Sequence, residues 1–321
     1  MQLEDLRVVL KVAEFRSITA AATHLDMQMA TASAAVKRVE VALGVELFVR
    51  TTRHLRLSTA GERYLPQCTA ALSMLDQAKQ TIHNDLGIIS GEIRLAVSSD
   101  LGRNIAIPWV DDFMVQYPQV TLRAHVSDSN VDFYRDALDI ALRYGAPADS
   151  NLYGFKICNV PRLLVASPEY LELHGTPTQP KDLLNHQCLF YQLQNILNDT
   201  WHFSCKESGA ERSYKIKPSA YCASNDGDLV RRWCVAGKGV AVKSCLDIAQ
   251  DLLAGRVVSL MPEYNLPQGE LWLISPSRQS ITPTVRLLRD MFRERTKALL
   301  TQLVEQGFIE RHVLEDDGKG F

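Results

Sequence analysis

The feature that most constrains this chain is a pair of short helical patterns within residues 17–44. Ser17 can cap the first helix, whose apolar residues recur at helical spacing as far as Leu25. After a short break, a second pattern repeats apolar residues at steps of four, three and four, and Gly44 can end it in the C′ position. Two helices in this order predict a helix-turn-helix, whose second helix enters the major groove of DNA.

A β-hairpin is predicted directly after the second helix. Residues 45–50 and 54–58 alternate apolar and polar side chains on either side of the polar turn at 51–53. Alternation on both sides of a short turn is typical of two paired strands. We therefore expect this hairpin to form the wing of a winged helix-turn-helix.

A long helix is predicted after the hairpin, because residues 59–62 (TAGE) have the spacing of a capping box. Apolar residues then recur at steps of three and four from Leu65 to Leu86, with Lys79 in one of the expected apolar positions. Such a seam favours a partner helix, although the helix could also lie on its own domain. Pro66 predicts a kink near the start of the helix.

Residues 1–65 resemble the N-terminal domain of LysR-type transcriptional regulators. The matching segments read AEFRSITAAATHL and VEVALGVELFVRTTRHLRLSTAGE. The resemblance implies a winged helix-turn-helix DNA-binding domain over residues 1–58 and a linker helix over 59–88, through which family members dimerise. It also implies an effector-binding domain over residues 89–321.

The same resemblance places the DNA-contacting residues on the second helix and in the wing. They are Gln28, Met29, Ala30, Ser33, Ala34, Lys37, Arg50, Thr51 and Arg53. Family members typically carry Ser, Gln, Pro, Ser and Arg at the first five positions, so Met29 and Ala34 replace two common hydrogen-bonding side chains. We expect this helix to pack on thymine methyl groups and the protein to depend partly on DNA shape. Lys37, Arg50 and Arg53 are expected to supply affinity through phosphates rather than sequence choice.

The rest of the chain alternates strands with helices. Strands are expected at 92–97, 120–126 and 139–143, and helices at 104–117 and 132–137. A strand that is followed by a helix and by another strand is typical of a parallel, doubly wound sheet. We therefore expect an α/β lobe to begin near residue 89.

The same alternation continues toward the end of the chain. Residues 161–167 are predicted to be a strand that leaves the first lobe, and a helix at 226–237 is followed by a strand at 240–242. A strand at 271–275 and an amphipathic helix at 284–304 end the pattern, and the polar tail beyond them is expected to fray.

This half of the chain resembles the two-lobed effector domain of LysR-type regulators, which is itself similar to type 2 periplasmic binding proteins. The segments that carry the resemblance are DLGRNIAIPWV, DIALRYG and SNDGDLVRRWCVAGKGVA. The resemblance implies one lobe of residues 89–164 plus 270–304, a second lobe of 165–269, and crossings near Val165 and Leu271. The fold class is therefore an α+β multidomain protein with a winged helix-turn-helix, a long linker helix and a two-lobed α/β effector domain.

Polar residues at predicted strand ends are the candidates for effector contact. They are Ser98, Ser99, Ser127, Arg143, Ser224 and Asn225. Backbone N–H groups and the helix dipole at such ends favour a small anion, although Ser and Asn at these positions also commonly cap helices. Arg143 is the basic residue of this set and could pair either with a carboxylate ligand or with an acidic neighbour. Asp100 and Asp128 lie nearby and would repel a carboxylate unless they point away as helix caps.

Composition agrees with a globular protein of several domains, since 46% of the residues are hydrophobic and 22% are charged. The net charge of −2 argues against a generally basic protein, but residues 37–56 carry five basic and two acidic side chains. This local basic surface coincides with the expected DNA contact. The start of the chain lacks a signal-peptide pattern, and no apolar segment reaches membrane-spanning length. We therefore expect a cytoplasmic protein with no membrane partner.

Motifs for catalysis or metal binding are missing from the sequence. It contains no GxSxG, Walker, HExxH or strand-following GxGxxG motif, so we expect no enzyme activity and no cofactor. The seven cysteines lack CxxC spacing, and none pairs with a histidine at ligand spacing, so we expect no metal site. Free thiols are expected, with a redox switch at Cys222, Cys234 or Cys245 as the alternative.

The sequence therefore predicts a sequence-specific, DNA-binding transcriptional regulator controlled by a small, anionic organic effector between two lobes. Its expected partners are promoter DNA, the effector and further copies of the chain, as a dimer or tetramer. The alternative is a solute-binding module or a binding-fold enzyme that carries the N-terminal domain incidentally.

Overall fold

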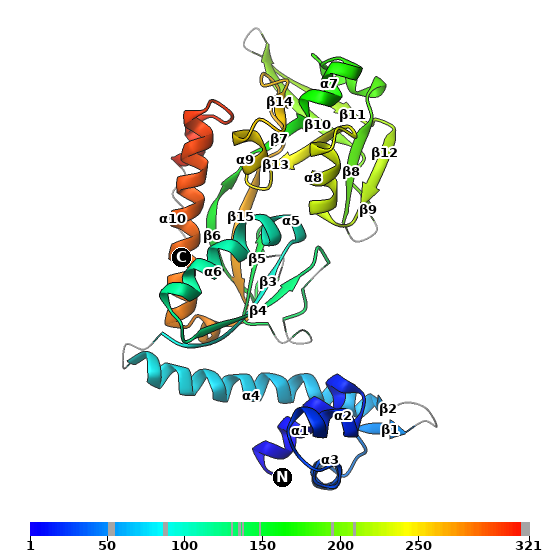
Figure 1. Cartoon of the computed structure of the whole chain (residues 1–321), viewed down its shortest axis with the longest axis vertical. Coiled ribbons are helices and arrows are strands. Elements are labelled where there is room, and N and C mark those ends of the chain that lie inside the picture. Colours follow the sequence, from blue (N-terminus) through cyan, green and yellow to red (C-terminus); the bar gives the residue numbers. More distant parts are fainter. Residues whose placement is uncertain are drawn as a thin grey trace. The chain divides into compact units, whose positions relative to one another are not determined.

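The computed structural model describes residues 1–50, 55–85, 89–129, 131–133, 136, 138–147, 149–193, 196–207 and 210–315. The chain divides into two compact units, and Figure 1 shows its elements coloured along the sequence. The first unit comprises Met1–Ile82 and Asp132–Ala137, and the second comprises His83–Val131 and Leu138–Phe321. No helix in the described ranges is long and apolar enough to cross a membrane.

The first unit contains the predicted helix-turn-helix and hairpin. Its elements are α1 (Leu3–Phe15), α2 (Ile18–His24), α3 (Met29–Leu43), β1 (Phe48–Arg50), β2 (Leu55–Leu57) and α4 (Thr59–Asp85). Ser17 caps α2 by accepting a hydrogen bond from the N–H of Ala20 at 3.2 Å. Gly44 ends α3 in the left-handed region, with a φ of 70°, as its position in the sequence predicted. β1 and β2 pair in antiparallel fashion, which confirms the hairpin.

The start of α4 differs from the predicted capping box. Ser58, rather than Thr59, caps the helix, because its Oγ accepts a hydrogen bond from the N–H of Gly61 at 3.0 Å. Gly61 is required there, since an added Cβ would lie 2.3 Å from the carbonyl oxygen of Leu47. The helix continues through Pro66 to Asp85.

The apolar seam of α4 is buried in its first half and becomes exposed further along the helix. Leu65, Cys68 and Leu72 are buried, whereas Leu75 is 45% exposed. The first half of the seam therefore packs within its own unit, which was the alternative to a partner helix. The side chain of Lys79 and all of Leu86 lie outside the described residues.

The second unit contains two lobes, each built on one mixed sheet. The first lobe contains β3 (Gly91–Val97), α5 (Ser99–Leu101), the π-helical η1 (Gly102–Ala106), α6 (Ile107–Gln116), β4 (Val120–Val126), β5 (Ile140–Tyr144), β6 (Tyr153–Val160), β15 (Gly269–Ser275), η3 (Arg278–Ser280), α10 (Pro283–Glu305) and η4 (Arg311–Leu314). Its sheet has the order β4-β3-β5-β15-β6. β3 runs parallel to β4 and β5, and β15 runs antiparallel to β5 and β6.

The second lobe repeats this plan. It contains β7 (Arg162–Ala166), α7 (Pro168–His174), η2 (Pro180–Asn185), β8 (Cys188–Leu193), β9 (Ile196–Leu197), β10 (Trp201–Glu207), β11 (Ala210–Ile216), β12 (Ala220–Ser224), α8 (Gly227–Val235), β13 (Val240–Ser244), α9 (Ala249–Leu253) and β14 (Val258–Leu260). The sheet order is β12-β8-β13-β7-β14, with β12, β8 and β13 parallel and β7 antiparallel to both of its neighbours. β10 and β11 form a separate hairpin.

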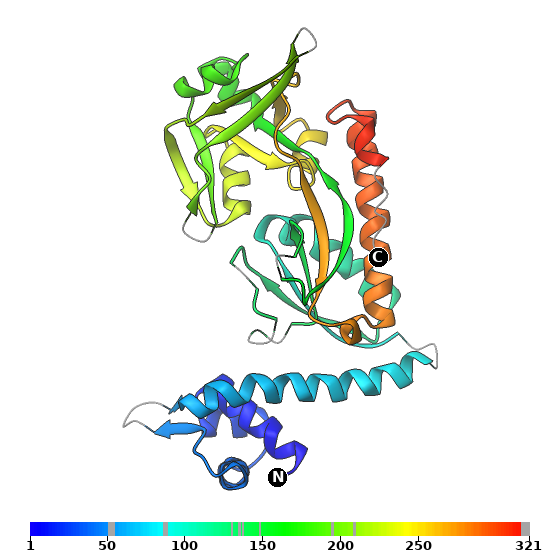
Figure 2. The ribbon, with the colours of Figure 1, turned by 180° about the vertical axis from the view of Figure 1, so that it is seen from behind.

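Both sheets are therefore mixed, and the prediction of a parallel sheet was wrong for the strands that join the lobes. β6 and β15, which lie side by side in Figure 2, carry the chain between the lobes in opposite directions. β6 was not predicted, since its glycine weakens the strand pattern. Gly154 is needed because an added Cβ would lie 2.9 Å from the ring of Trp272. The first crossing falls at Pro161, ahead of the expected position near Val165.

Two further expectations were wrong. Phe133 and Asp136 lie in turns and Asp132 has no regular structure, in place of the helix predicted for 132–137, whose other members lie outside the described residues. The tail beyond α10 does not fray at once, because Ile309 and Val313 are buried. These two side chains cover a small part of the core. The polar residues around them obscured their apolar spacing in the sequence.

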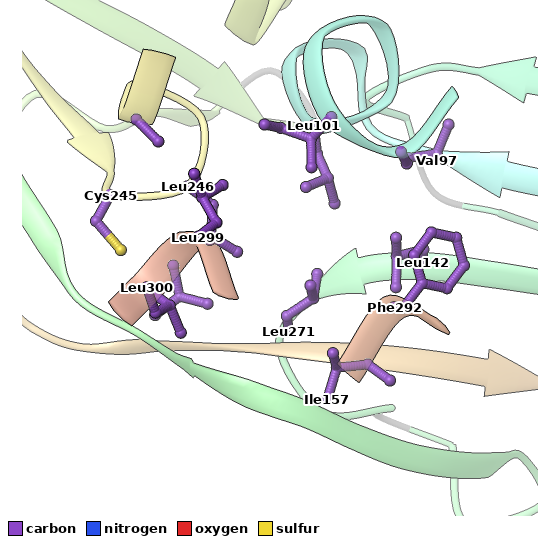
Figure 3. Packing of buried hydrophobic residues seen from close by; sticks show 14 of the residues in the cluster. Val97, Leu101, Leu142, Ile157, Cys245, Leu246, Leu271, Phe292, Leu299 and Leu300 are labelled. Carbon is purple, nitrogen blue, oxygen red and sulfur yellow. The ribbon is translucent and has the colours of Figure 1, made fainter. Parts of the chain in front are cut away.

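One apolar core extends through both lobes. It includes Leu142 and Leu271 of the first lobe and Cys245 of the second, together with Phe292 and Leu300 of α10. In Figure 3, Leu299 and Leu300 of α10 lie near Cys245 and Leu246, and Phe292 of the same helix lies near Leu142. This shared core holds the two crossing strands and α10 together, and so determines which residues of the lobes face each other.

Candidate DNA-binding and effector-binding sites

The helix α3 presents the predicted recognition residues to solvent. Ala32, Ala35 and Val39 are buried, which turns the opposite side of the helix outward. The exposed residues of the predicted set are Gln28, Met29, Ala30, Ala34 and Lys37, and Ser33 is half-buried. Alanine and methionine on this surface offer packing rather than hydrogen bonds to base edges.

The wing carries the remaining predicted DNA contacts. Thr51, Arg53 and the side chain of Arg50 lie outside the described residues. The described base of the wing is held by Glu40 on α3, whose Oε1 accepts a hydrogen bond from the N–H of Leu47 at 2.8 Å. The orientation of the wing therefore depends on the recognition helix itself.

An ion pair that the sequence analysis missed anchors α3 to α1. Arg38 Nε donates to the buried carboxylate of Asp5 at 3.2 Å. Hydrogen bonding from Arg38 lowers the pKa of Asp5 below its ordinary value. No local pattern marks this pair, because its members lie on α1 and α3, 33 residues apart in the chain.

In the second unit, three of the predicted effector residues lie together at the ends of neighbouring strands. Val97 is paired with Val126 and Leu142, so Ser98, Ser127 and Arg143 follow in register on β3, β4 and β5. Arg143 Nη2 donates to the carbonyl oxygen of Ser127 at 2.7 Å. Ser98 Oγ and Arg143 Nε are buried, and neither has a hydrogen-bond partner among the described residues.

The other three predicted effector residues, Ser99, Ser224 and Asn225, have surroundings that differ from those of Ser98, Ser127 and Arg143. The N–H and Oγ of Ser99 both donate to Asp128, at 2.7 and 2.5 Å. Ser224 Oγ accepts a hydrogen bond from the N–H of Asp226 at 3.0 Å, and Asn225 is exposed on the second lobe. Ser99 and Ser224 therefore have local structural partners, as is common for serine near a helix start.

Polar contacts join the two lobes along the helix starts. Arg103 of the first lobe pairs with Asp226 of the second at 3.0 Å. Asn104 of the first lobe donates to Asp228 Oδ1 at 2.9 Å. Asp228 is buried, whereas Arg103 is partly exposed, so this contact runs from the surface into the interface.

A buried ionic group lies deeper between the lobes. Asp100 of the first lobe pairs with Lys243 and with Arg231, the latter at 3.2 Å, and both cations belong to the second lobe. Burial, together with the nearby Asp247, raises the pKa of Asp100 to about 7 despite these cations. Lys243, inside an otherwise apolar strand, was the sequence signal that could have revealed this group.

A hollow of about 400 Å³ lies where the chain crosses between the lobes. Its lining residues are Tyr144, Gly145, Asn159, Arg162, Gln268, Gly269 and Glu270. Tyr144 also joins the lobes, because its hydroxyl donates to Asp247 at 2.6 Å. The volume lies within the range of small-molecule sites. The lining contains none of the predicted effector residues, although Arg143 precedes Tyr144 in the sequence.

Cys234 and Cys245 are not activated for redox chemistry, and the described acidic groups are not arranged to bind a metal ion. Burial raises the pKa of the Cys234 thiol to about 12 and that of Cys245 well above its usual range, so neither forms a thiolate readily. Cys222 is half-buried. Within the described ranges, no three His, Cys, Asp or Glu side chains are grouped to hold a metal ion.

The fold and these sites define a DNA-binding protein with a second, two-lobed α/β unit. Residues 3–62 match the family "Bacterial regulatory helix-turn-helix protein, lysR family", and residues 87–297 match the family "LysR substrate binding domain". The chain therefore belongs to the LysR family of transcriptional regulators, and it is a DNA-binding regulator rather than an enzyme.

Characterised relatives cover nearly the whole chain. The HTH-type transcriptional regulator DmlR of Escherichia coli K12 is 30% identical, over 91% of this chain and 94% of its own length. The solved structure of CrgA, a LysR-type regulator from Neisseria meningitidis, is 26% identical, with a TM-score of 0.54 over 94% of this chain and 99% of that chain. Full-length AphB, a virulence activator of Vibrio cholerae, is 26% identical, with a TM-score of 0.53 over 92% and 99%.

Proposed function

We propose that this regulator binds promoter DNA as a homo-oligomer in the cytoplasm and is controlled by a small, anionic organic molecule held between its two lobes. The observation that carries the proposal is the position of Arg143 at the strand ends of the first lobe. Its Nε, like Ser98 Oγ beside it, is buried without a hydrogen-bond partner among the described residues. Buried donors without partners are rare, and a ligand carboxylate would satisfy both groups.

Electrostatics supports an anion at this position. Burial lowers the pKa of Arg143 from its ordinary value, although Asp128 and Tyr191 nearby act in the opposite direction. Arginine nevertheless stays protonated at physiological pH. The carboxylate of a bound ligand would stabilise the buried positive charge of Arg143 further than these neighbouring residues do. Arg162, in the lining of the 400 Å³ hollow, is a second cation for the same role.

A ligand screen with matched variants tests the proposal. A library of small carboxylates is screened by thermal shift on the full-length protein, and hits are measured by calorimetry on wild type, Arg143→Gln and Arg162→Gln. The matched control is Arg123→Gln, an arginine on strand β4 of the same sheet whose side chain is 65% exposed. We expect Arg143→Gln to lose at least tenfold in affinity, because a charged hydrogen bond is worth about 1.5–3 kcal/mol.

The three variants separate the possible positions of the anionic group. A loss confined to Arg162→Gln would place the anionic group in the hollow and overturn the role of Arg143. Equal affinity in all variants would contradict an anionic effector at either place. Promoter binding, measured by gel shift with and without the hit, then shows whether the ligand changes the DNA complex, as regulation requires.

Oligomerisation is proposed from the second half of α4. Met74 and Leu75 expose 54% and 45% of their surface on a helix of 27 residues. A second copy of the helix would bury both side chains. We expect Leu75→Glu to shift the protein toward monomer in sedimentation experiments, whereas Gln67→Glu, which adds the same charge elsewhere on the helix, leaves the oligomer unchanged.

A further inference from the structure

The carboxylate of Asp128 joins the two lobes directly. Asp128 follows β4 in the first lobe, and its Oδ1 accepts the N–H of Ser99 at 2.7 Å. Its Oδ2 accepts both Ser99 Oγ, at 2.5 Å, and the N–H of Gly227, at 2.8 Å. Gly227 is the first residue of α8, in the second lobe. One side chain therefore satisfies donors from both lobes.

These donors are of the kind that bind an anionic ligand. The first N–H groups of a helix lack partners within the helix and carry the positive end of its dipole. Here Ser99 Oγ also accepts a hydrogen bond from the N–H of Asp228 at 3.3 Å, so the serine and the start of α8 form one connected set of donors. The carboxylate of Asp128, which is part of the protein itself, accepts hydrogen bonds from these donors.

We infer that Asp128 is an internal anion that holds the lobes together without an effector and excludes a second carboxylate from the start of α8. The inference deepens the proposed function, on which its consequence for the effector rests. Ser99 and the start of α8 are already occupied, which leaves Arg143 and Ser98 as the donors for an effector carboxylate. Asp128 thereby restricts where an anionic ligand can bind.

The surroundings of Asp128 reinforce its role. Arg103 pairs across the lobes with Asp226 at 3.0 Å and with Asp228 at 3.6 Å, and it also interacts electrostatically with Asp128. On the inner side, Arg143 lies close enough to interact with Asp128 electrostatically. The Asp128 carboxylate thus interacts with two arginines of the first lobe, Arg103 and Arg143, while its hydrogen bond to Gly227 reaches the second lobe.

Removal of the carboxylate, followed by its replacement from solution, tests the inference. Asp128→Ala in the full-length protein is compared with wild type by hydrogen–deuterium exchange, with no effector present. Segments 99–104 and 226–232 should exchange on the order of tenfold faster, because charged hydrogen bonds of this kind are lost. Sodium acetate should restore protection in the variant by filling the vacated position, whereas sodium chloride at equal ionic strength should not.

Controls make each outcome decisive. Asp111→Ala, which removes an exposed carboxylate from the same lobe, should exchange like wild type in both segments. If Asp128→Ala does not fold, Asp128→Asn, which keeps the shape and removes the charge, should still exchange faster than wild type. Wild-type exchange in the folded variant, or no response to acetate, would overturn the inference. Since no effector is used, failure here is distinct from failure of the Arg143 ligand test.

Discussion

Two adjacent basic residues on the recognition helix have different roles. Arg38 is bound to the buried carboxylate of Asp5 and fixes α3 against α1. Lys37, the next residue toward the helix start, is exposed beside the predicted base-reading residues. A single step along the helix therefore separates a residue that positions the helix from one that can reach a phosphate.

Lys37→Ala is expected to weaken binding to all DNA sequences by a similar factor. Loss of one phosphate contact should reduce the slope of log affinity against log salt by about one unit. Fluorescence anisotropy at several salt concentrations measures both quantities, and Lys181→Ala, an exposed lysine in the second lobe, serves as the control. A selective loss at one base position would contradict this role.

The raised pKa of Asp100 predicts a pH dependence of stability. Its pKa is about 7 in the folded protein and 3.8 ordinarily, so folding takes up a proton between these values. Stability from this group should therefore fall as pH rises from about 4 toward 7 and level off above it. Asn resembles the protonated form of Asp100 and does not titrate. The difference in melting temperature between Asp100→Asn and wild type should therefore shift in favour of the variant as pH rises from 5.5 to 8. An unchanged difference across that range would contradict a pKa near 7 for Asp100 in the folded protein.

At the scale of elements, α10 is the part that both lobes share. Its buried residues, including Phe292 and Leu300, belong to the same core as strands of each lobe. β6 and β15 reach this core from opposite directions, so the helix stabilises the crossings as well as the first sheet. Packing of α10 thus contributes to the alignment of the polar contacts between the lobes.

Phe292→Ala should destabilise the second unit by about 3–5 kcal/mol, because the side chain is fully buried and leaves a cavity. Urea unfolding of the full-length protein, followed by tryptophan fluorescence, measures the change. Leu173→Ala on α7, where the side chain is 75% exposed, should change stability by less than about 0.5 kcal/mol. If Phe292→Ala changed stability as little as Leu173→Ala, the role of Phe292 in the main core would be contradicted.

At the scale of the whole molecule, the protein separates DNA reading from the proposed ligand binding. The helix-turn-helix has its own core, which includes Val9, Val12 and Val39. The two lobes share another core, and the second lobe has a further apolar cluster that includes Tyr170 and Phe190. The facing surfaces of the lobes carry the polar contacts of Asp100, Asp128 and Tyr144. A change in how the lobes meet can therefore leave the recognition helix folded.

The sequence by itself determined most of the local elements and the family, but it missed β6. Short-range signals decided these features: the Ser17 cap, the Gly44 helix end and the alternation around the wing need only neighbours along the chain. The predicted strand ends identified a set of six candidates that includes Ser98, Ser127 and Arg143, which the register of β3, β4 and β5 then brings together. Side-chain periodicity and capping operate over a few residues, so they can be read without the fold.

Only the tertiary structure decided which residues meet across long separations. The Asp5–Arg38 pair, the Asp128–Gly227 bond and the mixed order of the sheets all join segments that no local pattern relates. Ser99 and Arg143 looked alike as ligand contacts in the sequence, yet one is occupied by Asp128 and the other retains a buried donor without a partner among the described residues. Hydrogen-bond satisfaction depends on neighbours in space, and those neighbours are set by the packing of whole elements.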